Sequence, residues 1–138
     1  MDTSALSEKL PTRKWSVEGF SRFWANPQNL EIIPEVIWPE IKGYWPRCKK
    51  PLVGREAYVK GIADFLAAVP NFRAEVSDYA VNGDVTFIRW VATGNPPVGA
   101  STLIGVDRLI LRDDFVLENH IHSDHPVFAY LAETETLG

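Results

Sequence analysis

Titratable side chains are concentrated in residues 118–125, which read Glu-Asn-His-Ile-His-Ser-Asp-His. In a strand, successive side chains point to opposite faces, so Glu118, His120, His122 and Asp124 would share one face. An imidazole titrates near neutral pH, and a neighbouring carboxylate can exchange a proton with it. The spacing therefore predicts an acid–base site on this strand. A solvated strand face or a dimer surface is the alternative.

The spacing of His120, His122 and Asp124 is also similar to that of metal ligands, because two imidazoles and a carboxylate can bind one ion. The remaining histidine, His125, lies in the same segment, so no second cluster elsewhere completes the ligand set. We therefore expect no metal ion.

Asp107 is a second candidate, because it interrupts an apolar stretch over residues 103–110. A buried carboxylate is costly unless it is paired or protonated. Asp107 could polarise a ligand oxygen. The alternative, an ion pair with Arg89 or Arg108, is the more common outcome.

Aromatic side chains make up 12% of the 138 residues, enough to line a pocket as well as a core. We expect Trp24, Trp38 and Trp90 to contact a small apolar or aromatic ligand, and Arg89 to polarise one of its oxygen atoms. Core packing is the alternative for each single ring.

Periodicity predicts two helices followed by a sheet. Apolar residues recur at three- and four-residue steps after Ser16, an N-cap residue type, up to Asn26-Pro27, and again over 55–68. A brief extended piece over 36–38 and an irregular loop over 42–54 separate the helices. After them the pattern alternates, which predicts strands over 72–81, 84–93, 101–111 and 115–123.

Asn82-Gly83 predicts a hairpin between the first two of these strands, because such a turn needs positive φ angles. Helices first and strands later give an α+β fold, with a curved antiparallel four-stranded meander and a short extra strand packed against N-terminal helices. We expect residues 1–14 to form a flexible arm and residues 15–138 to form a single domain.

The net charge of -4 disfavours binding to nucleic acid or to anionic lipid. No apolar stretch approaches the ~20 residues needed to span a bilayer, and the first ten residues lack the pattern of a signal peptide. The single cysteine, Cys48, excludes an intramolecular disulfide and favours a reducing compartment. We therefore expect a cytoplasmic protein with no nucleic-acid or membrane partner.

Several short motifs within residues 16–126 suggest a family. They are Phe23-Trp24, Val53-Gly54-Arg55-Glu56-Ala57, Val69-Pro70-Asn71-Phe72, Arg89-Trp90-Val91-Ala92-Thr93-Gly94, Gly105-Val106-Asp107-Arg108 and the strand end at 118–124. Together with the order of elements, they resemble the nuclear transport factor two-like superfamily and, within it, the SnoaL-like polyketide cyclases.

The resemblance implies a cone-shaped fold with an internal pocket, a homodimer formed through the sheet, and chemistry without a cofactor. It implies that Asp124 is the general acid or base, assisted by His122 and His120, in an isomerase or cyclase acting on a cyclic or polyketide-like carbonyl compound. In ketosteroid isomerases, an aspartic acid at the place of Asp107 stays protonated and donates to an oxyanion. A non-catalytic binding or dimerisation module is the alternative, because the superfamily hosts both.

The sequence departs from two better-defined activities of the superfamily. Ketosteroid isomerases place a tyrosine in the first helix, where this chain has Phe20, Phe23 and Trp24. Epoxide hydrolases of this fold use an Arg-x-Asp pair, and here Val91 stands at the aspartate position after Arg89. We therefore expect neither of these two activities.

Overall fold

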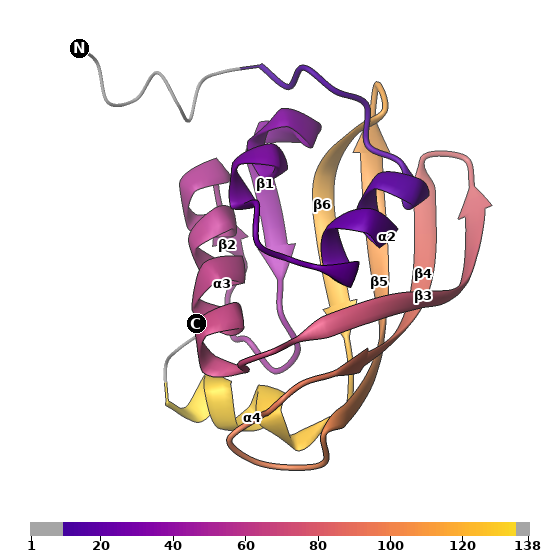
Figure 1. The fold of residues 1–138 in the computed structure, drawn as a ribbon. Coiled ribbons are helices and arrows are strands. Elements are labelled where there is room, and N and C mark those ends of the chain that lie inside the picture. Colours follow the sequence, from indigo (N-terminus) through magenta and orange to yellow (C-terminus); the bar gives the residue numbers. More distant parts are fainter. Residues whose placement is uncertain (1–9, 135–138) are drawn as a thin grey trace.

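The computed structural model describes residues 10–134, which form one curved mixed sheet with helices over one face (Figure 1). The elements in chain order are α2 (Val17–Ala25), the 3-10 helix η1 (Leu30–Val36), β1 (Ile37–Tyr44), β2 (Leu52–Val53), α3 (Arg55–Ala68), β3 (Arg73–Asn82), β4 (Val85–Thr93), β5 (Thr102–Arg112), β6 (Phe115–His122) and α4 (Pro126–Glu133). The strand order is β2-β1-β6-β5-β4-β3.

The predicted α+β class and the antiparallel meander are confirmed, since β3, β4, β5 and β6 pair antiparallel in sequence order. The predicted short extra strand forms as β1, which is longer than expected and pairs parallel to β6. The second added strand, β2, was not predicted and pairs antiparallel to β1, so the predicted irregular loop over 42–54 is wrong at both of its ends. The alternation of β1 is obscured by Pro39, which lies where the β1–β6 register shifts between Ile37 and Lys42. A proline cannot donate to the ladder, so such an irregularity is where it is tolerated.

Both predicted helices form where the periodicity places them. The Ser16 side chain accepts a hydrogen bond from the Gly19 backbone N–H and so caps α2. In α3, Tyr58, Ile62 and Phe65 are buried at steps of four and three residues. Figure 1 shows α2 and α3 on the same side of the sheet, so these stripes face its inner surface.

The predicted hairpin joins β3 to β4, but its central residues are Gly83 and Asp84 because Asn82 still pairs with Val85. Only Gly83 has a positive φ, 61°, the pattern of a type II′ turn, which places glycine first. At the next hairpin, between β5 and β6, Asp113 and Asp114 take φ values of 53° and 69°. Aspartate tolerates this left-handed conformation better than most residues.

A C-terminal helix, α4, was not predicted from the sequence. The His125 Nδ1 atom accepts from the Val127 backbone N–H at 3.0 Å and caps this helix. Phe128 stacks on Phe65 with ring centroids 5.7 Å apart. In Figure 1 α4 lies across the end of the sheet below α3.

Backbone hydrogen bonds hold part of the predicted arm, and the residue after it, against the rest of the fold. The backbone N–H groups of Thr12 and Arg13 donate to the carbonyl of Glu35, and that of Trp15 donates to the carbonyl of Asp114. Residues 1–9 lie outside the described part of the chain. The segment before α2 therefore borders the space that the sheet and helices enclose.

Candidate functional site

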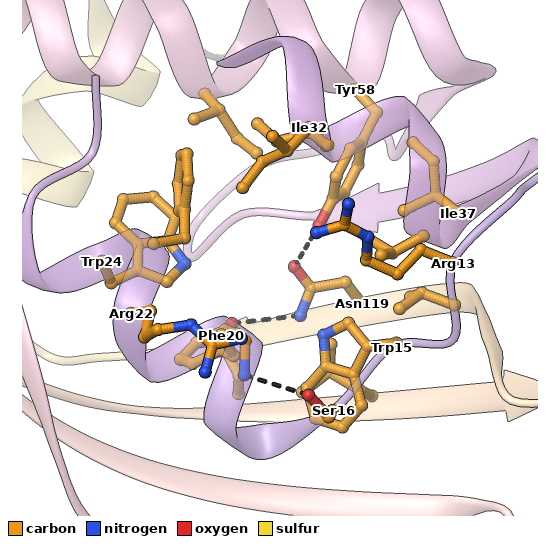
Figure 2. Close-up of a pocket in the computed structure, with 18 of the residues that line it drawn as sticks. Arg13, Trp15, Ser16, Phe20, Arg22, Trp24, Ile32, Ile37, Tyr58 and Asn119 are labelled. Carbon is orange, nitrogen blue, oxygen red and sulfur yellow. Dashed lines mark hydrogen bonds between the residues drawn. The ribbon is translucent and has the colours of Figure 1, made fainter. Parts of the chain in front are cut away.

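A cavity of about 310 Å³ lies between α2, η1, α3 and the inner face of β5 and β6. This volume suits a small organic ligand. Phe20 and Trp24 of α2 form an aromatic wall, Ile32 lies opposite on η1, and the sheet contributes Asn119 (Figure 2). Asp107 of the sheet also lines the cavity. The cavity is therefore mostly apolar, and Asp107 and Asn119 are the polar groups at its buried end.

Asp107 is the centre of these polar groups. The Trp90 Nε1–H donates to its Oδ1 atom at 2.9 Å, and the Asn119 Nδ2–H donates to its Oδ2 atom at 3.2 Å. The Tyr58 hydroxyl donates to the Asn119 Oδ1 atom at 2.8 Å, so it holds the amide with its N–H toward Asp107. Figure 2 shows Tyr58 reaching from α3 to meet Asn119 on the sheet.

Strand register brings these residues together. Asp107 of β5 lies opposite Ile121 of β6, and the next inward position pairs Leu109 with Asn119. On the other side of β5, Trp90 lies opposite Gly105.

The indole of Trp90 covers Gly105 so closely that a Cβ atom there would overlap its ring. Glycine at this position therefore lets the indole lie flat across β5. In that position the Trp90 Nε1–H reaches Asp107.

Burial controls the electrostatics of this group. It raises the pKa of Asp107 from 3.8 to about 6, although the hydrogen bonds from Trp90 and Asn119 oppose the shift. Burial, together with the nearby Asp107 charge, also raises the pKa of the Tyr58 hydroxyl well above 10. Tyr58 therefore stays a hydrogen-bond donor at neutral pH, while Asp107 can both release and accept a proton there.

The ion pair expected as the alternative for Asp107 does not form. Within residues 10–134 no cation pairs with Asp107. Arg89 lies on the outer face and donates to the Ser77 hydroxyl at 2.8 Å. Asp107 is thus a carboxyl with two neutral donors at the end of a cavity, which is an arrangement that suits proton transfer.

Comparison with protein families decides where the chain belongs. The sequence model of the SnoaL-like polyketide cyclases matches residues 16–107, more than half of the chain and all of it from α2 to Asp107. This chain belongs to the SnoaL-like polyketide cyclase family. No curated protein gave a match.

Solved structures share the SnoaL-like fold at low sequence identity. A protein described as a SnoaL-like polyketide cyclase from Jannaschia sp. CCS1 superposes with a TM-score of 0.68 at 18% identity, covering 88% of this chain and 90% of that one. One described as a polyketide cyclase from Bacillus cereus ATCC 10987 gives 0.64 at 23%, covering 83% and 75%. TerC, co-crystallised with polyporic acid, gives 0.65 at 14%, covering 85% and 91%. At these identities the likeness establishes the fold.

In this SnoaL-like chain the charged face of β6 points away from the cavity. Asn119 is buried and Ile121 lines the cavity, so His120 and His122 are on the opposite face. The predicted acid–base cluster is therefore displaced: His122 and Asp124 are exposed, and Asp124 follows the end of β6. His120 stacks on Tyr44 at 4.2 Å and contacts Glu118 at 2.9 Å.

A β-bulge is the physical reason for this displacement. On β6, Val116 pairs with Leu111 and Glu118 pairs with the next residue, Ile110, so Leu117 is an extra residue in the ladder. Val116 is buried, and strict alternation from it would have pointed His120 and His122 inward. One inserted residue exchanges the two faces of the rest of the strand.

Of the remaining predicted site residues, two line a cavity and two lie away from it. Trp24 lines the main cavity, and Trp90 lines a smaller chamber of about 30 Å³ beside it that Asp107 also borders. Trp38 lies elsewhere: its indole N–H donates to the Arg112 carbonyl and its ring packs on Phe115. Trp38 and Arg89 therefore do not reach the cavity.

Sequence reasoning missed Tyr58 and Asn119. Tyr58 begins the buried stripe of α3 that continues through Ile62 and Phe65, and a polar tip at the start of an apolar stripe was the available signal. Asn119 gave no comparable signal, because only the bulge makes it face inward.

Two further properties bear on the site. Within residues 10–134 no group of three or more histidine, cysteine, aspartate or glutamate side chains is arranged to hold a metal ion. In that same part of the chain, every helix is too short or too polar to cross a membrane.

Proposed function

We propose that this protein binds a cyclic or polyketide-like carbonyl compound in the cavity and moves protons on it, with Asp107 as general base and acid. The observation that carries the proposal is the buried Asp107 carboxyl, which has a pKa raised to about 6 and no cationic partner within the described residues. A base with a pKa near the operating pH is largely ionised and still binds a proton strongly enough to remove it from the substrate. The cyclase name of the family and the mostly apolar cavity of this chain both support a polyketide-like substrate.

The chemistry is a proton abstraction followed by ring closure. Ionised Asp107 takes a proton from a carbon next to a carbonyl group, and the electron pair of that C–H bond forms an enolate. The enolate carbon then bonds to a second carbonyl carbon of the same molecule, and the resulting alkoxide takes the proton back from Asp107. Electrons and protons balance within the substrate, so the step needs no cofactor.

Tyr58 would stabilise the enolate oxygen. Its raised pKa keeps the hydroxyl protonated, and it already donates to Asn119 at 2.8 Å beside Asp107. Turning this O–H toward a ligand oxygen exchanges one hydrogen bond for another. Asn119 and Trp90 would hold the Asp107 carboxylate in place through the exchange.

The test is exchange of the protons next to the carbonyl of α-tetralone, a flat bicyclic ketone, followed by NMR in deuterated water. The wild-type protein should accelerate the exchange, and Asp107→Asn should lower the catalysed rate by roughly 10²–10⁴-fold, because the amide cannot act as a base. The rate should rise with pH through about 6, where Asp107 ionises.

Asp124→Asn is the matched comparison, because it makes the same change at an exposed carboxylate outside the cavity. We expect it to exchange at nearly the wild-type rate. Loss of exchange in Asp124→Asn with full activity in Asp107→Asn would restore the assignment predicted from the sequence and refute this proposal.

A pure binding module of the same fold would give a different pattern. A ligand at about a hundred times its dissociation constant stabilises the fold by ~2.7 kcal/mol, which a thermal-shift measurement detects easily. Stabilisation by α-tetralone without any proton exchange would assign the cavity to binding alone.

A further inference from the structure

The open end of the cavity carries three cationic side chains. Arg13 and Lys14, from the segment before α2, and Arg22, from α2, all line it. Among residues 10–134, the only carboxylate in the lining is Asp107, at the buried end. In a chain with a net charge of -4, this end of the cavity is a local exception.

The two ends of the cavity differ in how far their charged side chains are exposed to solvent. The Arg13, Lys14 and Arg22 side chains are 68%, 74% and 71% exposed, whereas Asp107 is 6% exposed. Figure 2 shows Arg13 and Arg22 extending beside the cavity from different segments. A ligand that reaches Asp107 with one end would therefore have its other end among these cations.

Each cation already has a carboxylate partner, but that partner lies outside the cavity lining. The partners are Glu35 at 3.5 Å for Arg13, Asp114 at 3.3 Å for Lys14 and Glu18 at 3.2 Å for Arg22. Exposed pairs of this kind contribute little to stability, so an incoming anion can share or replace the partner. A planar carboxylate also matches the fork of an arginine side chain.

We propose that the ligand is a carbonyl compound with a carboxylate at the end remote from the reacting carbonyl, and that Arg13, Lys14 and Arg22 bind this carboxylate. The proposal rests on the function proposed above and names the substrate class for the same site. The apolar stretch between the two ends, with Phe20 and Trp24 as one wall, requires a flat hydrophobic body. Charge at one end and a reacting carbonyl at the other fix which way the ligand enters.

The test compares two compounds that differ only in charge: α-tetralone with a carboxylate on the far edge of its aromatic ring, and the methyl ester of the same acid. Binding is followed by quenching of tryptophan fluorescence, since Trp15 and Trp24 line the cavity. At low ionic strength the acid should bind roughly tenfold more tightly than the ester, the effect of one added charge-assisted hydrogen bond. The preference should shrink as salt is added, because the cations are exposed.

The variants Arg13→Gln and Arg22→Gln should each reduce the preference, and a triple variant that includes Lys14→Gln should abolish it while ester binding stays unchanged. Lys60→Gln is the control: Lys60 is 75% exposed and paired with Asp64 on α3, and it is not part of the cavity lining. It should keep the full preference for the acid.

Equal affinity of the wild-type protein for acid and ester would overturn the inference, as would a preference that survives in the triple variant. Failure of the proposed chemistry would look different. The acid would still be preferred, but Asp107→Asn would exchange protons as fast as the wild-type protein. If neither compound binds, both proposals fall.

Discussion

Asp107 shows how a single carboxyl can be buried without a counter-ion. Two neutral donors, the Trp90 indole and the Asn119 amide, replace part of the hydration that the carboxylate loses. They do not replace all of it, so the pKa stays raised at about 6. The residue therefore destabilises the fold when it is ionised.

The same shift predicts a pH dependence of stability. The folded state binds the Asp107 proton more tightly than the unfolded chain, so the free energy of unfolding falls as pH rises from about 3.8 to about 6. Two pKa units correspond to about 3 kcal/mol. Urea unfolding at pH 3.5–7 should therefore show wild-type stability falling by about this amount relative to Asp107→Asn, in which the change is absent.

The difference in unfolding free energy between the wild-type protein and Asp107→Asn reports on Asp107 alone, because all other carboxyl groups are common to both proteins. A difference that does not vary with pH would mean that the Asp107 carboxyl keeps its ordinary pKa in the folded protein, and the role as a neutral-pH base would lose its basis.

At the scale of elements, β5 positions the site by leaving space as well as by supplying side chains. Gly105 has no Cβ, so the Trp90 indole from β4 can lie across β5 and reach Asp107 two residues along. The bulge at Leu117 of β6 then presents Asn119 to the same carboxyl. Two local features of neighbouring strands thus set both hydrogen bonds to Asp107.

Gly105→Ala should displace the indole and weaken its hydrogen bond to Asp107. We expect a loss of stability of about 1–3 kcal/mol from overpacking, measured by urea unfolding. Because the Trp90 hydrogen bond lowers the pKa of Asp107, the pH profile of proton exchange should also move to higher pH.

Gly83→Ala controls for the cost of replacing a glycine. Gly83 has a φ of 61° and open space around its Cα, so alanine there should cost about 1–2 kcal/mol through backbone strain alone. Its exchange profile should match the wild type. An unshifted profile in Gly105→Ala would show that the indole does not tune Asp107.

At the scale of the whole molecule, the sheet has one covered and one uncovered face. On the uncovered face Phe87 of β4 and Ile104 of β5 are 41% and 46% exposed, and the stacked pair Tyr44 and His120 lies on β1 and β6. A sheet face that exposes large apolar side chains offers a surface that another protein can cover. We therefore expect the homodimer through the sheet that the resemblance implies.

Ile104→Glu should convert this dimer to a monomer, because it would bury an unpaired charge in the interface. Sedimentation equilibrium measures the change directly. Val53→Glu is the comparison, since Val53 is 59% exposed on β2 at the edge of the sheet, and this variant should remain dimeric. A wild-type protein that sediments as a monomer would rule out the dimer.

The sequence by itself determined the elements whose signals are local. The Ser16 cap, the helical steps of α2 and α3, the glycine turn after β3 and the alternation of the four meander strands all follow from periods of a few residues. It also identified Asp107 and Trp90, because a carboxyl in an apolar strand and an indole in an alternating one are visible in the sequence.

Only the tertiary structure decided which residues meet in the cavity. Alternation sorts the side chains of β6 into two sets, but the bulge at Leu117 and the placement of α2 and α3 determine which set is covered. The parallel pairing of β1 with β6, and the reach of Tyr58 from α3 to Asn119, join residues 61 or more positions apart. Such contacts depend on how the elements dock, which local sequence periodicity does not determine. The docking therefore places Asp107 in the cavity and leaves the charged end of β6 outside it.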